Sequence, residues 1–176
     1  MYNFKNNFVI FLFLLLSGCA ANVKEVIHNP VNKVDVAFKD VFYLDISHSK
    51  SIPKSKDLTS SIQTLNELIS KKHNGSLTIL SNVKDKVNNG VQVNISIQNF
   101  RYVSGFGRFM AGVMVGDAAL MIKIRMIEIS SGKVIGESHF DTQSDFGDGI
   151  FGATTSRQLD AMAVKVVQYM NLIKNS

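Results

Sequence analysis

The feature that most constrains the fold is a strict alternation of apolar and polar residues over 91–97. This period of two predicts a strand with one buried and one solvated face. Residues 118–129 repeat the pattern in a longer strand, with Lys123 and Arg125 on its solvated face. A half-buried sheet needs one apolar layer to cover it. The alternating apolar residues are Val91, Val93, Ile95 and Ile97, then Leu120, Ile122, Ile124 and Met126; the polar ones of the first strand are Gln92, Asn94, Ser96 and Gln98.

Two amphipathic segments supply that covering layer. Leu58, Ile62, Leu65 and Ile69 recur at helical spacing, which predicts a helix that stops at the Asn-Gly pair 74–75. A second stripe predicts a helix over 154–173. Further strands are expected at 34–46, where a slip in the pattern suggests a bulge, at 77–80 and at 134–140. We therefore expect an α+β fold: a two-layer sandwich of order β-α-β-β-β-β-α, its mostly antiparallel sheet covered by two helices.

The N-terminal 18 residues have the form of an export signal. Lys5 precedes nine consecutive apolar residues at 8–16. This run is too short to cross a bilayer, which takes about 20 residues, but it suits the apolar core of a signal peptide. Leu16, Ser17, Gly18 and Cys19 follow. The alternative is a buried cysteine at the end of a short apolar helix.

The tetrapeptide that ends in Cys19 resembles the bacterial lipobox. The resemblance implies a lipoprotein whose mature chain begins at Cys19, with a diacylglycerol thioether and an N-linked acyl chain such as palmitate. Two or more acyl chains give a stable membrane anchor. Ala20, where an aspartate would favour retention in the inner membrane, favours the outer membrane, with the domain in the periplasm. We expect residues 19–33 to be a lipidated tether and residues 34–176 a single domain.

Composition narrows the remaining function classes. The chain has 176 residues, 45% hydrophobic and 19% charged, with one cysteine, so it is neither a disordered polymer nor a disulfide scaffold. Its net charge of +5 is spread along the chain and forms no basic stripe with aromatic platforms. We expect no nucleic-acid partner.

The most distinctive internal segment carries Arg108, Gly112 and Gly116 at four-residue spacing, with apolar residues between them. Glycines four apart let another backbone approach closely. The segment is therefore our candidate contact with a protein partner or a membrane. One alternative is a glycine-tolerant crossover tucked into the core. Another is a subunit contact in a homo-oligomeric ring or pore.

No catalytic or metal-binding set is evident. His28, His48, His73 and His139 are never three or four apart, so they form no helical metal pair. Three aspartates in a glycine-containing loop, Asp141, Asp145 and Asp148, do not follow the spacing of a calcium loop and suit turns equally well. We expect no metal, no cofactor beyond the lipid, and no enzymatic activity. The alternative is a cell-envelope hydrolase whose site the sequence does not mark.

From Val91 to Tyr169 the chain resembles bacterial lipoproteins of the family called domain of unknown function 4410. The matching features are the alternating strand, Arg108 with Gly112 and Gly116, the turn at Ser131–Lys133, and the glycine-containing loop before the last helix. Glu128 stands where the family pattern has aspartate. The resemblance implies a fold and an envelope location, and no chemistry. The combined expectation is a lipid-anchored binding or scaffold domain for an envelope protein complex, or a subunit of a secretion or pore assembly.

Overall fold

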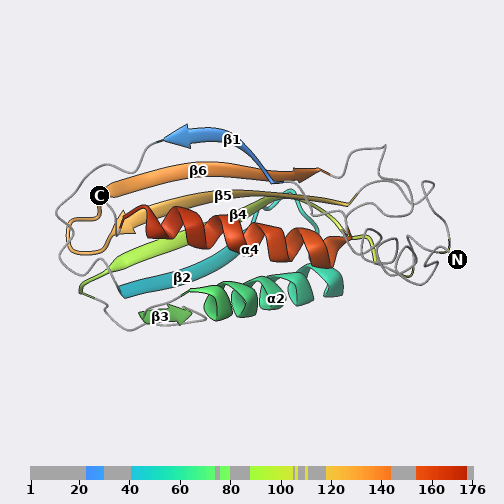
Figure 1. Ribbon diagram of the computed structural model, residues 1–176, viewed down its shortest axis with the longest axis horizontal. Helices are drawn as coiled ribbons and strands as arrows, with labels where there is room; N and C mark the ends of the chain where they lie inside the picture. Colours follow the sequence, from blue (N-terminus) through green and yellow to red (C-terminus); the bar gives the residue numbers. More distant parts are fainter. Residues whose placement is uncertain are drawn as a thin grey trace, which may run out of the picture.

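The computed structural model describes residues 23–29, 41–73, 76–79, 88–104, 106, 110, 118–143 and 154–173. These residues form a mixed six-stranded sheet with two helices on one face, as Figure 1 shows. The predicted α+β class and the covering of the sheet by two helices are confirmed. Among the described helices, none is both long and apolar enough to span a membrane.

The sheet is antiparallel on one side and parallel on the other. The strands are β1 (Lys24–Asn29), β2 (Val41–His48), β3 (Ser76–Ile79), β4 (Val91–Arg101), β5 (Ala119–Glu128) and β6 (Val134–Gln143). Their order across the sheet is β1-β6-β5-β4-β2-β3. Strand β2 runs parallel to both β3 and β4, while the other pairs are antiparallel. A helical crossover joins β2 to β3, as parallel neighbours require.

Alternation along the strands decides which face the helices cover. The predicted core positions of β4 and β5 are fully buried, and Phe42, Leu44 and Ile135 join them from neighbouring strands. The helices complete this core with Leu65 and Met170, both fully buried. Among the described residues no helix lies over the other face of the sheet, and we call it the open face. Its central residues are Asp45, Ser47, Gln92, Asn94, Ser96, Lys123, Arg125, Glu137 and His139.

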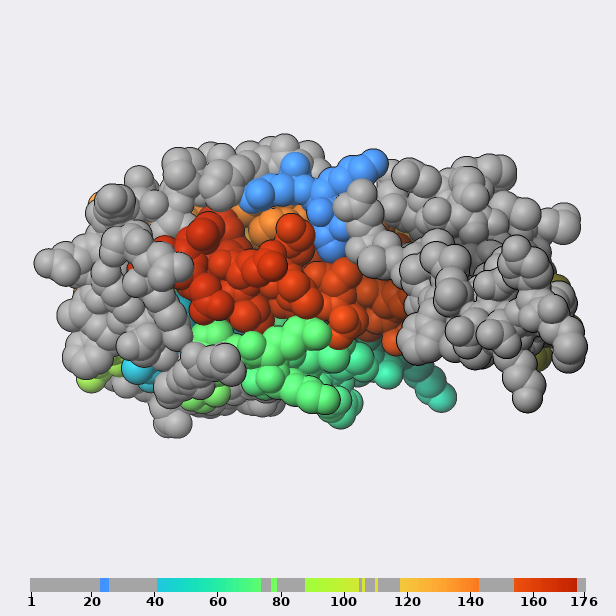
Figure 2. Space-filling model, viewed as in Figure 1, coloured from blue at the N-terminus to red at the C-terminus, as the bar shows by residue number. Residues whose placement is uncertain are grey.

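Both predicted helices are present in the structure. Helix α2 (Lys56–Lys72) starts after Ser55, whose Oγ accepts a hydrogen bond from the Leu58 amide at 3.0 Å. Helix α4 (Thr155–Asn171) follows Thr154, whose side chain makes no capping bond. The helices lie side by side across the sheet (Figure 2), and Lys72 Nζ is 2.8 Å from Asp160 Oδ1 between them. The predicted stop at residues 74–75 lies outside the described residues.

Strand β1 corrects the sequence prediction, which treated residues 19–33 as an irregular tether. Lys24–Asn29 pairs antiparallel with β6 at the edge of the sheet. The register shifts between Glu25 and Ile27, and this irregularity breaks the alternation that would have marked the strand. The domain therefore begins at least ten residues earlier than the predicted boundary at residue 34.

Strand β2 occupies part of the segment predicted as a strand at 34–46. Phe42 and Leu44 face the core, and no register shift occurs in its pairing with β3 or β4. The suggested bulge is therefore absent from Val41–His48, and residues 34–40 lie outside the described residues.

Both helices start at the same end of the molecule, at the right of Figure 1, where β2, β4 and β6 end. We call this the helix-start end. Strand β1 begins there too, because the register places Lys24 beside Asp141, Asp141 beside Met121, and Met121 beside Asn99 near the end of β4. The start of the domain and the end of β4 thus lie in one transverse row of the sheet.

Candidate functional site

The open face carries a compact set of ion pairs. Glu137 on β6 receives Lys123 Nζ at 2.8 Å and Arg125 Nε at 3.2 Å, both from β5. The hydrogen bond from Lys123 lowers the pKa of Glu137, burial opposes that shift, and the charges of Lys123, Arg125 and His139 lower the pKa further. Glu137 is therefore an ionised carboxylate paired with two cations, and a carboxylate in this state is unsuited to act as a general acid.

Polar side chains that the sequence predicted for the solvated face are gathered here. Gln92, Asn94 and Ser96 lie on β4 in register with Ile127, Arg125 and Lys123 of β5. They are only partly exposed, and within the described residues Asn94 Oδ1 is buried without a hydrogen bond. The described part of the open face thus presents partly exposed polar side chains beside a set of ion pairs.

The helix-start end contains a buried polar cluster that the sequence did not reveal. The Val103 amide donates to Thr155 Oγ1 at 2.8 Å, and the Thr155 amide donates to the Val103 carbonyl at 3.1 Å. Gln158 Nε2 donates to the carbonyls of Ala118 and Thr142, at 2.9 Å and 3.0 Å. The first two turns of α4 therefore hold the chain as it leaves β4, enters β5 and leaves β6.

Exposed apolar side chains lie next to this cluster. Tyr102 is 46% exposed, Phe106 75% and Met110 66%. The sequence pointed to this stretch through its glycine spacing, and the residues described within it, Phe106 and Met110, are exposed. Arg108, Gly112 and Gly116, the predicted contact residues, lie outside the described residues.

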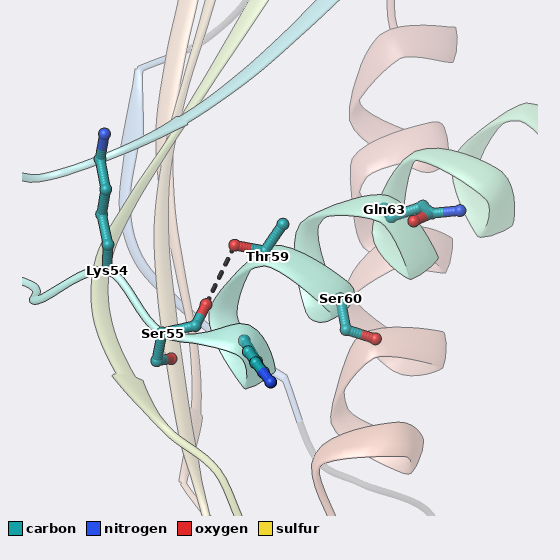
Figure 3. Close-up of a pocket in the computed structure, with 6 residues that line it drawn as sticks. Lys54, Ser55, Thr59, Ser60 and Gln63 are labelled. Carbon is teal, nitrogen blue, oxygen red and sulfur yellow. Dashed lines mark hydrogen bonds between the residues drawn. The ribbon is translucent and has the colours of Figure 1, made fainter.

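A shallow hollow of about 470 Å³ lies at the start of α2, lined by Lys54, Ser55, Lys56, Thr59, Ser60 and Gln63. Figure 3 shows these side chains around the first turns of the helix. The hydroxyls of Ser55 and Thr59 are engaged in the cap, since Thr59 Oγ1 donates to the Ser55 carbonyl at 3.0 Å. No histidine or carboxylate is among the described residues that line this hollow, so none of them offers a base to activate either hydroxyl.

A smaller hollow of about 120 Å³ lies between β1 and α4, lined by Glu25, Phe140, Lys165, Gln168, Tyr169 and Leu172. Burial raises the pKa of Tyr169, and the negative charges of Glu25 and Glu137 raise it further. Tyr169 therefore stays protonated at neutral pH. Glu25 accepts a hydrogen bond from Ser138 Oγ at 2.6 Å. The volume is below the 300 Å³ or so typical of a small-molecule site.

The remaining predicted candidates are dispersed. His48 ends β2, His139 faces outward on β6 beside Lys123, and buried His73 packs edge-on against Phe42 with ring centroids 5.1 Å apart. No three potential ligands converge on a metal-sized site among the described residues. Cys19, Asp145 and Asp148 lie outside the described residues.

The chain matches no protein-family model and no curated protein by sequence. Similarity to solved structures is clear at the level of the fold. The PelC dodecamer from Paraburkholderia phytofirmans matches 85% of this chain and 96% of its own, with a TM-score of 0.55 and 13% identity. A point-substituted PelC dodecamer matches with a TM-score of 0.52 and 13% identity, over 85% of this chain and 97% of that one. At this identity the likeness establishes a shared fold.

Proposed function

We propose that this chain is a lipid-anchored, non-catalytic scaffold protein of the bacterial envelope that works as a homo-oligomer. The observation that carries the proposal is the fold likeness to PelC, which spans nearly the whole of that protein and links this fold to a dodecamer. The lipobox-like sequence at Cys19 supplies the anchor, and Ala20 favours the outer membrane with the domain in the periplasm. The resemblance to the family called domain of unknown function 4410 supports the same envelope location.

The non-catalytic role is supported by how the described polar groups are used. Glu137 forms ion pairs with Lys123 and Arg125. The hydroxyls of Ser55 and Thr59 form hydrogen bonds within the N-terminal cap of α2. A hydrolase would need a nucleophile or a carboxylate pair whose pKa values are pushed apart, in a concave site. The described residues that line the two hollows do not provide such a set.

The open face is the surface we assign to protein contact. Among the described residues no helix covers this face of the sheet. Its partly buried polar side chains suit a hydrogen-bonded interface. In a closed ring each subunit uses two different surfaces, so the open face of one copy would meet another surface of its neighbour.

The anchor is tested by growing cells with a clickable fatty acid. The wild-type protein should carry the label and lack residues 1–18, whereas Cys19→Ser should remain unlabelled and unprocessed. A labelled Cys19→Ser protein would contradict the anchor.

Assembly is tested by native mass spectrometry of the full-length lipidated protein extracted in mild detergent. A defined multimer is expected, and a protomer alone at all concentrations would exclude the oligomeric role. The contact surface is then mapped with a photo-cross-linker on an introduced cysteine, since Cys19 is the only native one and the lipid would block it. Ser47→Cys on the open face should yield a product containing a second copy.

The matched control is Ser70→Cys, an exposed position on α2. It reports background capture by a reactive group at an exposed site. Equal capture at both positions would remove the open face from the proposal, and capture of a different envelope protein at Ser47 alone would assign the face to a heteromeric contact.

A further inference from the structure

We propose that the helix-start end of the domain is a membrane-contact surface, where apolar side chains enter the interfacial region of an anionic bilayer. The inference deepens the proposed function and rests on its lipid anchor. Three independent features converge on this end: exposed apolar side chains, a surplus of exposed cations, and the start of the folded chain.

The apolar contribution comes from Tyr102, Phe106 and Met110. Of the five large hydrophobic side chains exposed in the described chain, these three fall within nine residues. An aromatic ring with a polar tip and a flexible thioether suit the headgroup boundary. Tyr102 is held at this end, because the adjacent Val103 is bound by Thr155 through two hydrogen bonds.

The charges at this end complement anionic headgroups. Lys54 and Lys56 flank the cap of α2, and Arg157 lies in the first turn of α4. Lys50 and Arg101 are exposed nearby, in the loop after β2 and at the end of β4. The exposed acids near these cations are Asp57 in the first turn of α2, Glu25 in β1 and Asp160 in the second turn of α4, so the cations remain in excess. Each basic residue near an anionic leaflet adds to the attraction.

The direction of β1 brings the lipid to the same end. Lys24 lies in the same transverse row of the sheet as Asn99. Asn99 precedes the exposed Tyr102 by only three residues. Cys19 precedes Val23 by four residues, a reach of at most about 14 Å even when fully extended. An anchor at Cys19 therefore keeps the helix-start end close to the bilayer, where its apolar side chains can enter.

The absence of tryptophan makes this orientation measurable. Full-length lipidated Phe106→Trp protein is reconstituted in vesicles of phosphatidylethanolamine and phosphatidylglycerol with brominated acyl chains, which quench a nearby indole. The control is Lys133→Trp, because Lys133 is exposed and lies in the turn between β5 and β6 at the opposite end. We expect several-fold greater quenching of Phe106→Trp than of Lys133→Trp, with a blue-shifted emission.

The charge contribution is tested in the same assay. Lys54→Glu with Lys56→Glu, placed in the Phe106→Trp protein, should reduce quenching on phosphatidylglycerol vesicles and have little effect on phosphatidylcholine. Lys133→Glu, an exposed position in the turn at the opposite end, should change quenching on neither. Equal loss with Lys133→Glu would overturn the assignment of the charges to this end.

Flotation of the vesicles separates this inference from the anchor beneath it. Protein that floats with the vesicles but shows equal quenching at both positions overturns the membrane-contact surface and leaves the anchor standing. A blue shift at Phe106→Trp without bromine quenching also overturns it, because the ring then contacts protein. Protein that does not float contradicts the lipid anchor and the inference with it.

Discussion

Val103 and Thr155 are joined by reciprocal hydrogen bonds, 2.8 Å from the Val103 amide to Thr155 Oγ1 and 3.1 Å from the Thr155 amide to the Val103 carbonyl. Both residues are buried, and 52 positions separate them along the chain. The pair ties the start of α4 to the segment that leaves β4. It also gives α4 a side-chain bond at its first turn, where Thr154 provides none.

We predict that Thr155→Val lowers the free energy of unfolding by about 1–3 kcal/mol. Valine keeps the shape of threonine but leaves the buried Val103 amide without its acceptor. Thr155→Ser should retain most of the stability, because the hydroxyl remains. Urea unfolding followed by circular dichroism measures the difference.

The control for this substitution is Ser156→Ala at the next, exposed position. It should change stability by no more than about 0.5 kcal/mol, as surface substitutions usually do. If Thr155→Val proved as mild as Ser156→Ala, the reciprocal pair would not hold α4 in place.

Most of the fold follows from local patterns. The alternation from Val91 to Ile97 and the stripe that includes Leu65 both reflect one buried face, so burial and sequence agree. Strand β1 breaks that rule. It lies at an edge with one neighbour, its register shifts after Glu25, and its existence depends on pairing with β6, more than a hundred residues away.

The features of the candidate surfaces were less predictable. That Lys123 and Arg125 share a face follows from their spacing, but their common contact with Glu137 requires the register of β5 on β6. Phe106 and Met110 lie in an apolar stretch that a core crossover would explain equally well. Only the tertiary structure shows that these two side chains face outward.

Gly90 and Gly132 both have positive φ, at 115° and 68°, yet their surroundings differ. A Cβ on Gly90 would lie 2.8 Å from the Val41 carbonyl oxygen, whereas nothing lies within 4 Å of one on Gly132. We predict that Gly90→Ala destabilises by about 2–4 kcal/mol, through backbone strain and overpacking. Gly132→Ala should cost about 1 kcal/mol for its left-handed backbone alone.

Thermal unfolding of Gly90→Ala and Gly132→Ala measures the loss of stability at each glycine. Gly132→Asn should be milder than Gly132→Ala, because asparagine tolerates the left-handed region. Equal destabilisation by alanine at both glycines would mean that the close approach of Val41 to Gly90 is relieved at little cost.

Glu137 should make stability depend on acid pH. Its pKa in the folded protein is lowered, chiefly by the hydrogen bond from Lys123. The stabilisation is therefore complete above the unfolded pKa, near 4.5, and is lost as the pH falls through the folded value. The partly exposed pairs should contribute about 0.5–1 kcal/mol at neutral pH.

The comparison is between wild type and Glu137→Gln, unfolded in urea at a series of pH values. The difference in free energy of unfolding should shrink towards low pH and also in high salt, which screens partly exposed charges. Asp57→Asn, at an exposed position in the first turn of α2, serves as the control for a general loss of carboxylate charge. A constant difference between wild type and Glu137→Gln across the acid range would contradict the ion-pair account.

Gln158 provides the sharpest test of the polar cluster at the helix-start end. Its Nε2 donates to the carbonyls of Ala118 and Thr142, and the side chain is fully buried. Gln158→Met keeps the side-chain volume but removes both of these hydrogen bonds, so each buried carbonyl loses this donor. Part of this cost is offset, because among the described residues Gln158 Oε1 has no hydrogen bond and its burial is unfavourable in the wild type.

We therefore expect Gln158→Met to destabilise by about 1–3 kcal/mol, less than two stranded carbonyls alone would cost. Gln168→Met, on the exposed side of the same helix, should be close to neutral. Hydrogen exchange adds a local readout: Gln158→Met should speed exchange near Ala118 and Thr142, where β5 begins and β6 ends, before the centre of the sheet. Uniform acceleration along β5 would instead indicate global destabilisation, and Gln158 would then be an ordinary core residue, not the link between α4 and these two strand ends.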